Sequence, residues 1–530
     1  MTRVVVRCDA SLSIGSGHVI RCRTLGRELK KSGAEVLFLC RRQPGDLIGL
    51  LEREFQVLTL PKQQLLPCEG LENRELYSAW LGCSQEQDAQ DFIQALLIAN
   101  LNNFDWLIAD HYGLDATWES QVQIGLKKDV PHKLLAIDDL ADRNHQADIL
   151  LDQNFFGESS NQRYQWLVPT QCRQLLGPQY ALLGPEYAVL HPLVPSRKDA
   201  CRVLIFFGGV DKENLTTRAL EAFNDPKLDH LSVDVVLGHA SPHRKAVAEL
   251  VAQRNLTTLH DPLPSLAGLI ARADLAIGAG GTTSWERACL RLPSLVVTIA
   301  ANQKSFTEAL HNAGHIRLLG DASTVSSSHI RHALKTWVSE SLRTNAGWNL
   351  TDGFGARRLV LAMLGTKSAI SLRPAEADDE SLLLHWANDP QVRKNSFSPN
   401  LITPSEHHKW FMRGLSNSNR LLLIATTEDN FPIGQIRFDR LPIPANGGAQ
   451  EAMIDLSIDR CARGHGLAVK VLNLGFLAMK KHWGPRIEAV AEVWTSNAAS
   501  NACFARANFT EERLSSADAS YQGVKRWRKA

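Results

Sequence analysis

A histidine follows a glycine-rich turn near the N-terminus, in residues 15–21 (Gly-Ser-Gly-His-Val-Ile-Arg). The turn comes after the apolar run 4–6 and opens a predicted helix through Lys31. Backbone N–H groups and the dipole at a helix N-terminus attract anions, and they disfavour a charged imidazole. We therefore expect His18 in the neutral form that a general base needs, with Arg21 on the same helix face. The alternative is that His18 only caps or packs the turn.

A second glycine-rich turn occupies residues 278–286 (Gly-Ala-Gly-Gly-Thr-Thr-Ser-Trp-Glu) at the end of an apolar run. Glycine has no Cβ, so Gly280 and Gly281 let the backbone approach a diphosphate, and Thr282 adds a hydroxyl donor. Glu286 lies about one helical turn further on, where a carboxylate could accept hydrogen bonds from both ribose hydroxyls. The turn predicts a nucleotide site; the alternative is a glycine turn before a capped helix.

A third candidate site lies in residues 463–468 (Arg-Gly-His-Gly-Leu-Ala), before a predicted helix that ends near His482. Consecutive amides in such a turn point at a pyrophosphate, and the helix dipole supports them. The pattern Arg-x-x-Gly-x-Ala resembles the acetyl-coenzyme A signature of the GNAT acyltransferases. A predicted strand, 487–494, and the polar run 497–501 follow, as in that family. The resemblance implies these coenzyme-binding residues: Arg463, Gly464, Gly466, Ala468, Asn497 and Asn501.

Short apolar runs alternate with helical stretches through residues 1–166, and the pattern restarts at 203–209. Such alternation indicates a parallel sheet covered by helices on both faces. A Pro-rich passage, 190–195, reads as a linker, and the composition changes again near residue 370. We predict two Rossmann-like domains and a C-terminal α+β domain, with these boundaries: 1–190, 200–365 and 370–530.

Polar residues follow several of the predicted strands. Ligands of parallel sheets bind beyond the carboxyl ends of the strands, so these residues are expected to share a cleft. In the first domain they are Asp9, Asp110, His111, Tyr112, Asp138 and Asp139, and in the second Asn302 and Gln303.

The composition is that of an ordinary globular protein of 530 residues with a net charge of +2. This charge gives no reason to expect nucleic acid or a membrane surface as a partner. The 10 cysteines contain no C-x-x-C pair, which favours buried thiols in a reducing compartment over disulfides or zinc. No signal peptide or membrane-spanning run is apparent. We expect a cytoplasmic protein without a metal.

The order of motifs through residue 364 resembles the UDP-sugar hydrolases of pseudaminic acid biosynthesis (the PseG family), which share a GT-B-like arrangement of two Rossmann-like domains. The resemblance implies hydrolysis of UDP-2,4-diacetamido-2,4,6-trideoxy-β-L-altropyranose to UDP and free sugar. It implies that His18 is the base and that Asp9, Tyr112 and Asn302 assist catalysis. The implied substrate-binding residues are Gly17, Arg21, Asp110, His111, Gly209, Gly280, Gly281, Thr282 and Glu286.

The last domain resembles the GNAT branch that contains ribosomal-protein acetyltransferases and the amino-sugar N-acetyltransferases of the same pathway (the PseH family). The resemblance implies acetyl-coenzyme A as cofactor and a UDP-4-amino sugar as acceptor, so the chain would join two consecutive steps. Phe504 stands where this family often has a proton-donating tyrosine, and water or Tyr521 could replace it. Candidate general bases are Glu451, Asp455 and Glu492.

Three other functions remain open. The first two domains could transfer a UDP-sugar to an acceptor, since the Glu286 turn recognises the nucleotide and not the acceptor. They could instead form a non-catalytic UDP-sugar-binding module that regulates the acetyltransferase, although a binder needs no base at His18. The last domain could acetylate protein N-termini or antibiotics.

Overall fold

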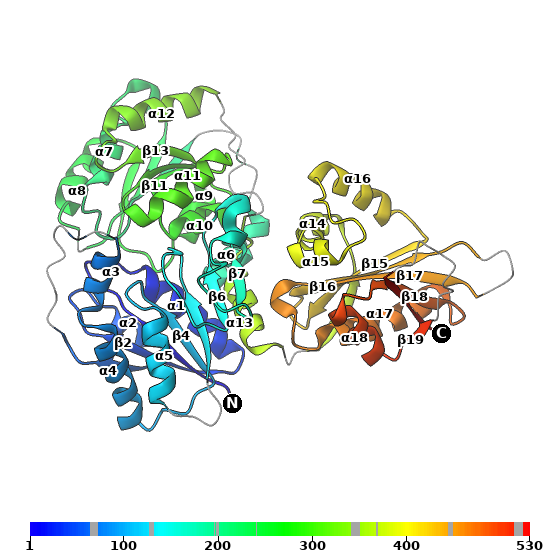
Figure 1. Cartoon of the computed structure of the whole chain (residues 1–530). Helices are drawn as coiled ribbons and strands as arrows, with labels where there is room; N and C mark the ends of the chain where they lie inside the picture. Colours follow the sequence, from blue (N-terminus) through cyan, green and yellow to red (C-terminus); the bar gives the residue numbers. More distant parts are fainter. Residues whose placement is uncertain are drawn as a thin grey trace. The chain divides into compact units, whose positions relative to one another are not determined.

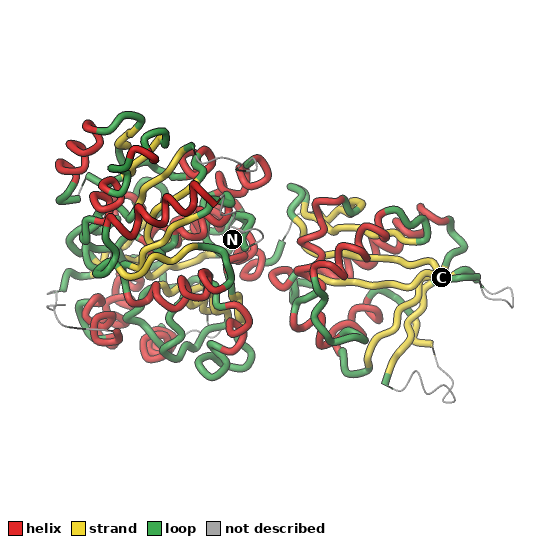
Figure 2. Tube along the Cα trace, turned by 90° about the horizontal axis from the view of Figure 1, so that it is seen from above, coloured by secondary structure: helices red, strands yellow, loops and turns green. Residues whose placement is uncertain are grey.

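The computed structural model consists of two units, Met1–Val360 and Leu361–Ala530 (Figure 1). It describes residues 1–63, 71, 73–126, 132–194, 197, 201–239, 241–340, 350–366, 369–443, 449–512 and 523–530. In the tube view of Figure 2, the strands of each unit run between layers of helices.

The N-terminal domain is built on a seven-stranded parallel sheet in the order β3-β2-β1-β4-β5-β6-β7. Its strands are β1 (Arg3–Cys8), β2 (Glu35–Arg41), β3 (Gln56–Leu60), β4 (Trp106–Asp110), β5 (Lys133–Ile137), β6 (Ile149–Asp152) and β7 (Arg173–Leu176). The central strands are buried apolar runs, because helices cover both faces of a parallel sheet. These helices are α1 (Gly17–Lys31), α2 (Ile48–Leu51), α3 (Asn73–Leu81), α4 (Gln85–Ile98) and α5 (Ala116–Gly125).

The second domain repeats this design with a six-stranded parallel sheet in the order β10-β9-β8-β11-β12-β13. Its strands are β8 (Arg202–Phe206), β9 (Ser232–Val236), β10 (Thr257–His260), β11 (Leu275–Ala279), β12 (Ser294–Thr298) and β13 (Arg317–Asp321). Its helices are α7 (Leu215–Glu221), α8 (Arg244–Gln253), α9 (Ala267–Arg272), α10 (Thr283–Cys289), α11 (Lys304–Asn312) and α12 (Ser327–Glu340). Both predicted Rossmann-like sheets are confirmed.

Two helices lie where the chain passes between these domains. α6 (Pro185–Leu190) and the 3₁₀ turn His191–Leu193 occupy most of the passage predicted as a linker, and Pro195 lies outside the described residues. α13 (Gly355–Leu364) returns to the N-terminal domain, where Gly355 packs directly on Ala181. Two Rossmann-like domains, followed by a helix that crosses back to the first of them, form the GT-B-like arrangement that was predicted.

The C-terminal unit contains a mixed sheet in the order β14-β15-β16-β17-β18-β20-β19. Its strands are β14 (Ile370–Pro374), β15 (Arg420–Thr427), β16 (Pro432–Arg440), β17 (Glu451–Ile458), β18 (Glu488–Trp494), β19 (Thr510–Glu512) and β20 (Val524–Lys529). Its helices are α14 (Glu380–Ala387), α15 (Pro390–Asn395), α16 (Pro404–Leu415), α17 (Leu467–Trp483) and α18 (Ala498–Arg506). The parallel strands β17 and β18 pair only over 451–453 and 488–490, and they separate beyond these residues.

Candidate functional site

The predicted site residues lie where the strand order of each parallel sheet reverses. In the N-terminal domain, the turn before α1 follows β1, and Asp110 ends the neighbouring strand β4. In the second domain, Gly209 follows β8, and Gly280 follows the neighbouring strand β11. Crevices at such positions are the usual ligand sites of open parallel sheets.

His18 and Asp110 form a buried pair, in which His18 Nδ1 lies 2.6 Å from Asp110 Oδ1. Arg21 binds the same carboxylate twice, through Nη2 to Oδ1 (2.6 Å) and through Nε to Oδ2 (2.7 Å). Cys22 donates its thiol to Asp110 Oδ2 at 3.2 Å, and Arg21 Nη1 reaches Asp139 at 3.0 Å. These three side chains, of His18, Arg21 and Cys22, lie on one face of the first turns of α1. The helix α1 therefore positions all of these donors to Asp110.

The charge on Asp110 determines which nitrogen of His18 carries the proton. Burial alone would raise the pKa of Asp110, but the charges of Arg21 and His18 and their hydrogen bonds lower it well below its usual range. An ionised carboxylate only accepts hydrogen bonds, so Nδ1 of His18 is the donor. In the neutral ring, Nε2 then carries the lone pair of a general base.

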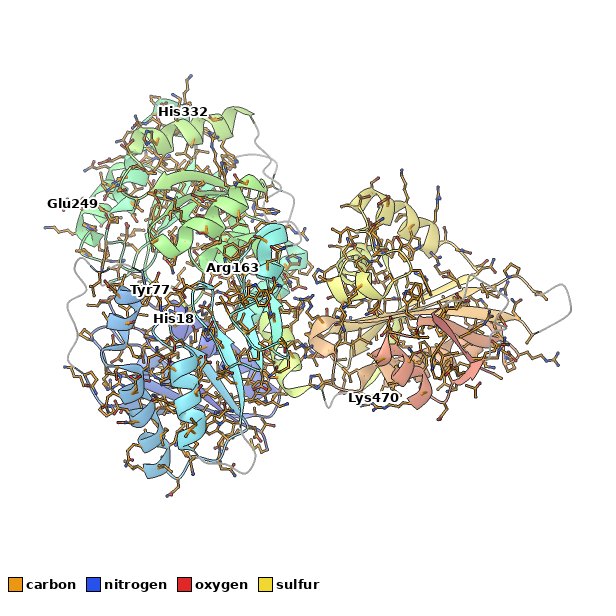
Figure 3. All side chains as sticks on the ribbon, in the orientation of Figure 1. His18, Tyr77, Arg163, Glu249, His332 and Lys470 are labelled. Atoms are coloured by element: carbon orange, nitrogen blue, oxygen red, sulfur yellow. The ribbon has the colours of Figure 1, made fainter. Side chains whose placement is uncertain are left out.

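The two Rossmann-like domains meet at this histidine. The ring of Tyr112 packs edge-on against His18, with centroids 4.6 Å apart, and its hydroxyl accepts a hydrogen bond from Asn302 Nδ2 at 3.4 Å. A Cβ at Gly17 would lie 3.7 Å from Thr282 Oγ1 in the second domain. Figure 3 labels His18 in the N-terminal domain, on the side that faces the second domain. The turns at Gly17 and Thr282 therefore lie against each other.

Asp9 and His111 lie behind this group and are fully enclosed. Asp9 Oδ1 accepts hydrogen bonds from Arg7 Nη1 (2.6 Å) and from the Arg41 amide (2.7 Å). His111 Nδ1 accepts from the Gly113 amide, and its Nε2 lies 3.9 Å from Asp9 Oδ2. Burial lowers the pKa of His111 to about 4. Both side chains are 3% exposed or less, so their contacts are with the protein core.

The glycine turn of the second domain is held tightly by its own fold. The Gly280 amide donates to Val297 O at 3.2 Å, and a Cβ at this glycine would collide with Thr307. Gly209 O accepts from the Gly238 amide at 3.0 Å. Glu286 Oε2 is screened from solvent without a hydrogen-bond partner among the described residues, and burial raises the pKa of Glu286 to about 7.

In the C-terminal unit, the predicted pyrophosphate turn precedes α17. Gly464 (φ +83°) and Gly466 (φ +72°) adopt left-handed conformations, and no atom lies within 4 Å of a Cβ built on either glycine. This open, amide-lined turn fits a pyrophosphate, with Ala468 in the first turn of the helix. The Arg463 side chain instead binds Ile458 O (2.9 Å) and Asp389 (3.0 Å), so it braces the turn.

The predicted asparagines also have partners within the fold. Asn497 caps α18 by accepting from the Ser500 amide, and Asn501 donates to Trp494 O and accepts from Trp527 Nε1. Phe504 packs against Phe509, with ring centroids 5.2 Å apart. Tyr521, the alternative proton donor, lies outside the described residues.

The three candidate general bases differ in their surroundings. The two carboxylate oxygens of Glu451 bind Arg526 and Arg528, each at 2.6 Å. Glu492 lies 3.9 Å from Arg526. Asp455 accepts from Gln435 at 2.6 Å and is about half exposed on β17, beyond the point where β18 separates from it. Asp455 therefore has the most accessible carboxylate of the three.

Comparison with known proteins identifies a domain family in the C-terminal unit and finds relatives of most of the chain. Residues 370–510 match the acetyltransferase (GNAT) domain family. Protein MJ1062 of Methanocaldococcus jannaschii is 22% identical over 82% of this chain and 82% of its own length. The spore coat polysaccharide biosynthesis protein SpsG of Bacillus subtilis is 23% identical over 67% of this chain and 96% of its own. The structure of Acinetobacter baumannii MurG covers 69% of this chain and all of its own, with 13% identity and a TM-score of 0.46.

The C-terminal unit is thus a GNAT acetyltransferase domain, as predicted, and it follows a GT-B-like pair of Rossmann-like domains. The acetyltransferase domain implies acetyl-coenzyme A as the acyl donor, and the open turn at Gly464 and Gly466 fits it. Within the described part of the chain, no helix has the length and apolar character to cross a membrane. The same residues include no cluster of three or more potential metal ligands.

One residue of this site was not predicted. Cys22 donates to Asp110, whereas Asp139, which was expected in the strand-end cleft, accepts from Arg21. The position of Cys22, four residues after His18 on a helix, was a usable signal, because residues so spaced share a face. Asp139 follows a different strand from Asp110, and only the assembled sheet brings both to Arg21.

Proposed function

We propose that residues 1–360 cleave the bond between the anomeric carbon of a UDP-sugar and its diphosphate, with His18 as general base. The observation that supports this is the His18–Asp110 pair, whose Nε2 carries a lone pair at the junction of the two domains. His18 Nε2 takes the proton of the attacking hydroxyl as the new C–O bond forms and UDP leaves. Thr282, which lies beside Gly17, and Glu286 are proposed to bind the nucleotide.

Water is our first candidate for the attacking hydroxyl. His18 is 5% exposed and Tyr112 is 7% exposed, and Asn302 closes over the tyrosine hydroxyl. Because little of His18 is accessible, we expect it to activate a small nucleophile such as water. The low exposure of His18 and the resemblance to the pseudaminic acid hydrolases together support hydrolysis of UDP-2,4-diacetamido-2,4,6-trideoxy-β-L-altropyranose to UDP and free sugar.

Transfer to an acceptor is the second candidate. A relative that covers this region is named for polysaccharide biosynthesis, which supports attack by a hydroxyl of a growing saccharide. The same His18–Asp110 pair would activate that hydroxyl, so the chemistry at the base is shared.

We propose that the acetyltransferase domain acetylates the 4-amino group of the precursor UDP-sugar. Backbone amides around Gly464 and Gly466 would hold acetyl-coenzyme A, which supplies the acetyl group when bound. Asp455 would accept a proton from the attacking amine through its exposed carboxylate. The joining of both domains in one chain supports a shared amino-sugar substrate.

One incubation tests these proposals together. The protein is mixed with acetyl-coenzyme A and the UDP-4-amino sugar, and thiol, UDP and free sugar are followed without any acceptor. Release of all three supports acetylation followed by hydrolysis. Thiol release with intact UDP-sugar, and UDP release only after an acceptor is added, would favour transfer. A His18→Asn variant should stop UDP release and leave thiol release unchanged; continued UDP release would contradict the role of His18.

A further inference from the structure

Arg287 is buried directly beneath the glycine turn of the second domain. It is 4% exposed and lies in α10, one residue after Glu286. Its Nη2 donates to Ala279 O (2.9 Å) and to Ser284 Oγ (3.1 Å), and its Nη1 lies 3.4 Å from Thr283 Oγ1. Ala279 is the last residue of β11, so the guanidinium is bonded to the turn itself.

This guanidinium has only neutral hydrogen-bond partners. Among the described residues, no carboxylate lies within ion-pair distance of Arg287, and its Nε has no hydrogen-bond partner. Burial lowers its pKa to about 10, so it is still charged at neutral pH. The neighbouring Glu286 makes no ion pair with Arg287 among the described residues, and burial raises its pKa to about 7. The charge of Arg287 is therefore poorly compensated.

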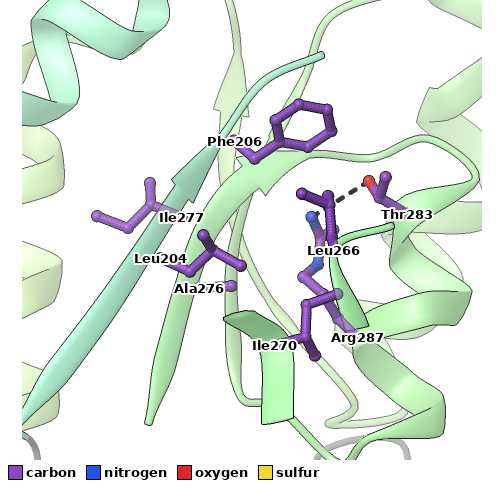
Figure 4. A pocket seen from close by; sticks show the side chains of 8 residues that line it. All are labelled: Leu204, Phe206, Leu266, Ile270, Ala276, Ile277, Thr283 and Arg287. Carbon is purple, nitrogen blue, oxygen red and sulfur yellow. Dashed lines mark hydrogen bonds between the residues drawn. The ribbon is translucent and has the colours of Figure 1, made fainter. Parts of the chain in front are cut away.

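Apolar side chains surround Arg287 and screen its charge only weakly. It borders a small apolar cavity of about 10 Å³ (Figure 4). The apolar side chains that line this cavity are Leu204, Phe206, Leu266, Ile270, Ala276 and Ile277. A charge among such groups is weakly screened, and burying it without an anion is costly. An anion on the other side of the turn would compensate it.

We propose that Arg287 supplies positive charge to the diphosphate site from beneath the glycine turn, without touching the nucleotide. This inference rests on the proposed UDP site at residues 280–286. Arg287 is then a positioning residue with a second, electrostatic role: it fixes Ala279 O and attracts the diphosphate through the turn. It discriminates a nucleoside diphosphate from the uncharged nucleoside.

The test compares UDP with uridine, because the two ligands share every nucleoside contact and differ in charge. Arg287→Gln should weaken UDP binding roughly 10-fold or more and change uridine binding less than about threefold. Arg287→Lys keeps the charge and should retain UDP affinity within about threefold. Both affinities are measured by calorimetry on the full chain. If glutamine prevents folding, Arg287→Met, whose side chain suits the apolar cavity, takes its place.

Arg197 offers a matched control in the same domain. It is also a desolvated arginine bonded to carbonyls, those of Ala273, Leu290 and Ile270, but at the amino ends of the strands. Arg197→Gln should alter neither affinity by more than about threefold. A parallel loss of UDP and uridine affinity in Arg287→Gln, equal losses in Arg287→Gln and Arg287→Lys, or unchanged UDP affinity would overturn the inference. A wild-type protein that does not bind UDP would overturn the proposed function as well.

Discussion

The carboxylate of Asp110 organises the candidate base. Four donor atoms reach it from three residues on one face of α1, namely His18, Arg21 with two atoms, and Cys22. Such a saturated carboxylate cannot rotate away from the imidazole without losing charged hydrogen bonds. The tautomer of His18 is therefore fixed by the fold.

Asp110→Asn should lower the rate of UDP release about 10²- to 10⁴-fold with little change in KM, because asparagine no longer holds His18 in the tautomer with a free Nε2. Steady-state measurement of UDP release checks this. Cys22→Ala serves as the control, since it removes only the weak thiol donor to the same carboxylate. Equal losses in the two variants would indicate a packing defect.

The proposed role of Glu286 at the ribose predicts that nucleoside binding depends on pH. Burial raises its pKa to about 7, so the carboxylate is protonated below pH 7 and can then accept fewer hydrogen bonds from ribose hydroxyls. Uridine affinity should rise about 10-fold from pH 6 to pH 8. Calorimetry with uridine avoids the titration of a phosphate. Glu286→Gln should remove this dependence; a slope that survives the substitution would assign it to another group.

At this scale, residue types and turns predict His18, Asp110 and Glu286 as site residues, and these roles stay predictions. The hydrogen-bond partners of these side chains were not predictable from the sequence. Asp110 was expected to bind substrate, yet its four hydrogen bonds are to α1, because the partner of a strand-end carboxylate depends on which helix lies over it. Arg463 and Asn501 match a family motif, but their side chains bind within the fold.

At the scale of elements, both parallel sheets place the glycine turns of the proposed site at the point where the strand order reverses. The apolar runs predicted these strands, and the rule for ligand position then predicted the cleft. The order of the strands was not readable from the runs, since it depends on which edges the crossovers join. The separation of β17 from β18 in the C-terminal unit could not be predicted from the sequence either.

The coenzyme turn before α17 depends on the left-handed conformation of Gly464. Gly464→Ala should weaken acetyl-coenzyme A binding about 10-fold, because a Cβ at φ +83° costs about 1–2 kcal/mol and displaces the amides. Gly484→Ala is the matched control, as Gly484 ends the same helix at φ +100° with equally open space. Coenzyme affinity and thermal unfolding are measured for both. Similar affinity losses would contradict a specific role for the turn.

At the scale of the whole molecule, the helix α13 completes the first unit. Arg358 binds Gln179 O (3.0 Å) and Asp352, and Leu359 and Val360 are buried. A fragment of residues 1–350 should be less stable than residues 1–366 by up to about 3–6 kcal/mol, the contribution of burying those two side chains. Chemical unfolding of the two fragments checks this. Equal stability would show that α13 contributes nothing to the first unit.

Gly17 lies near Thr282, and Tyr112 is hydrogen-bonded to Asn302. A substrate bound at these contacts would touch both Rossmann-like domains. Each of the two domains has its own sheet, and these two contacts join their turns. A UDP-sugar bound between the two domains would add contacts that hold them together, and these contacts would be lost when the product leaves. In calorimetry, the melting of the two domains would then merge into one cooperative transition when ligand is added, and would separate again as UDP departs.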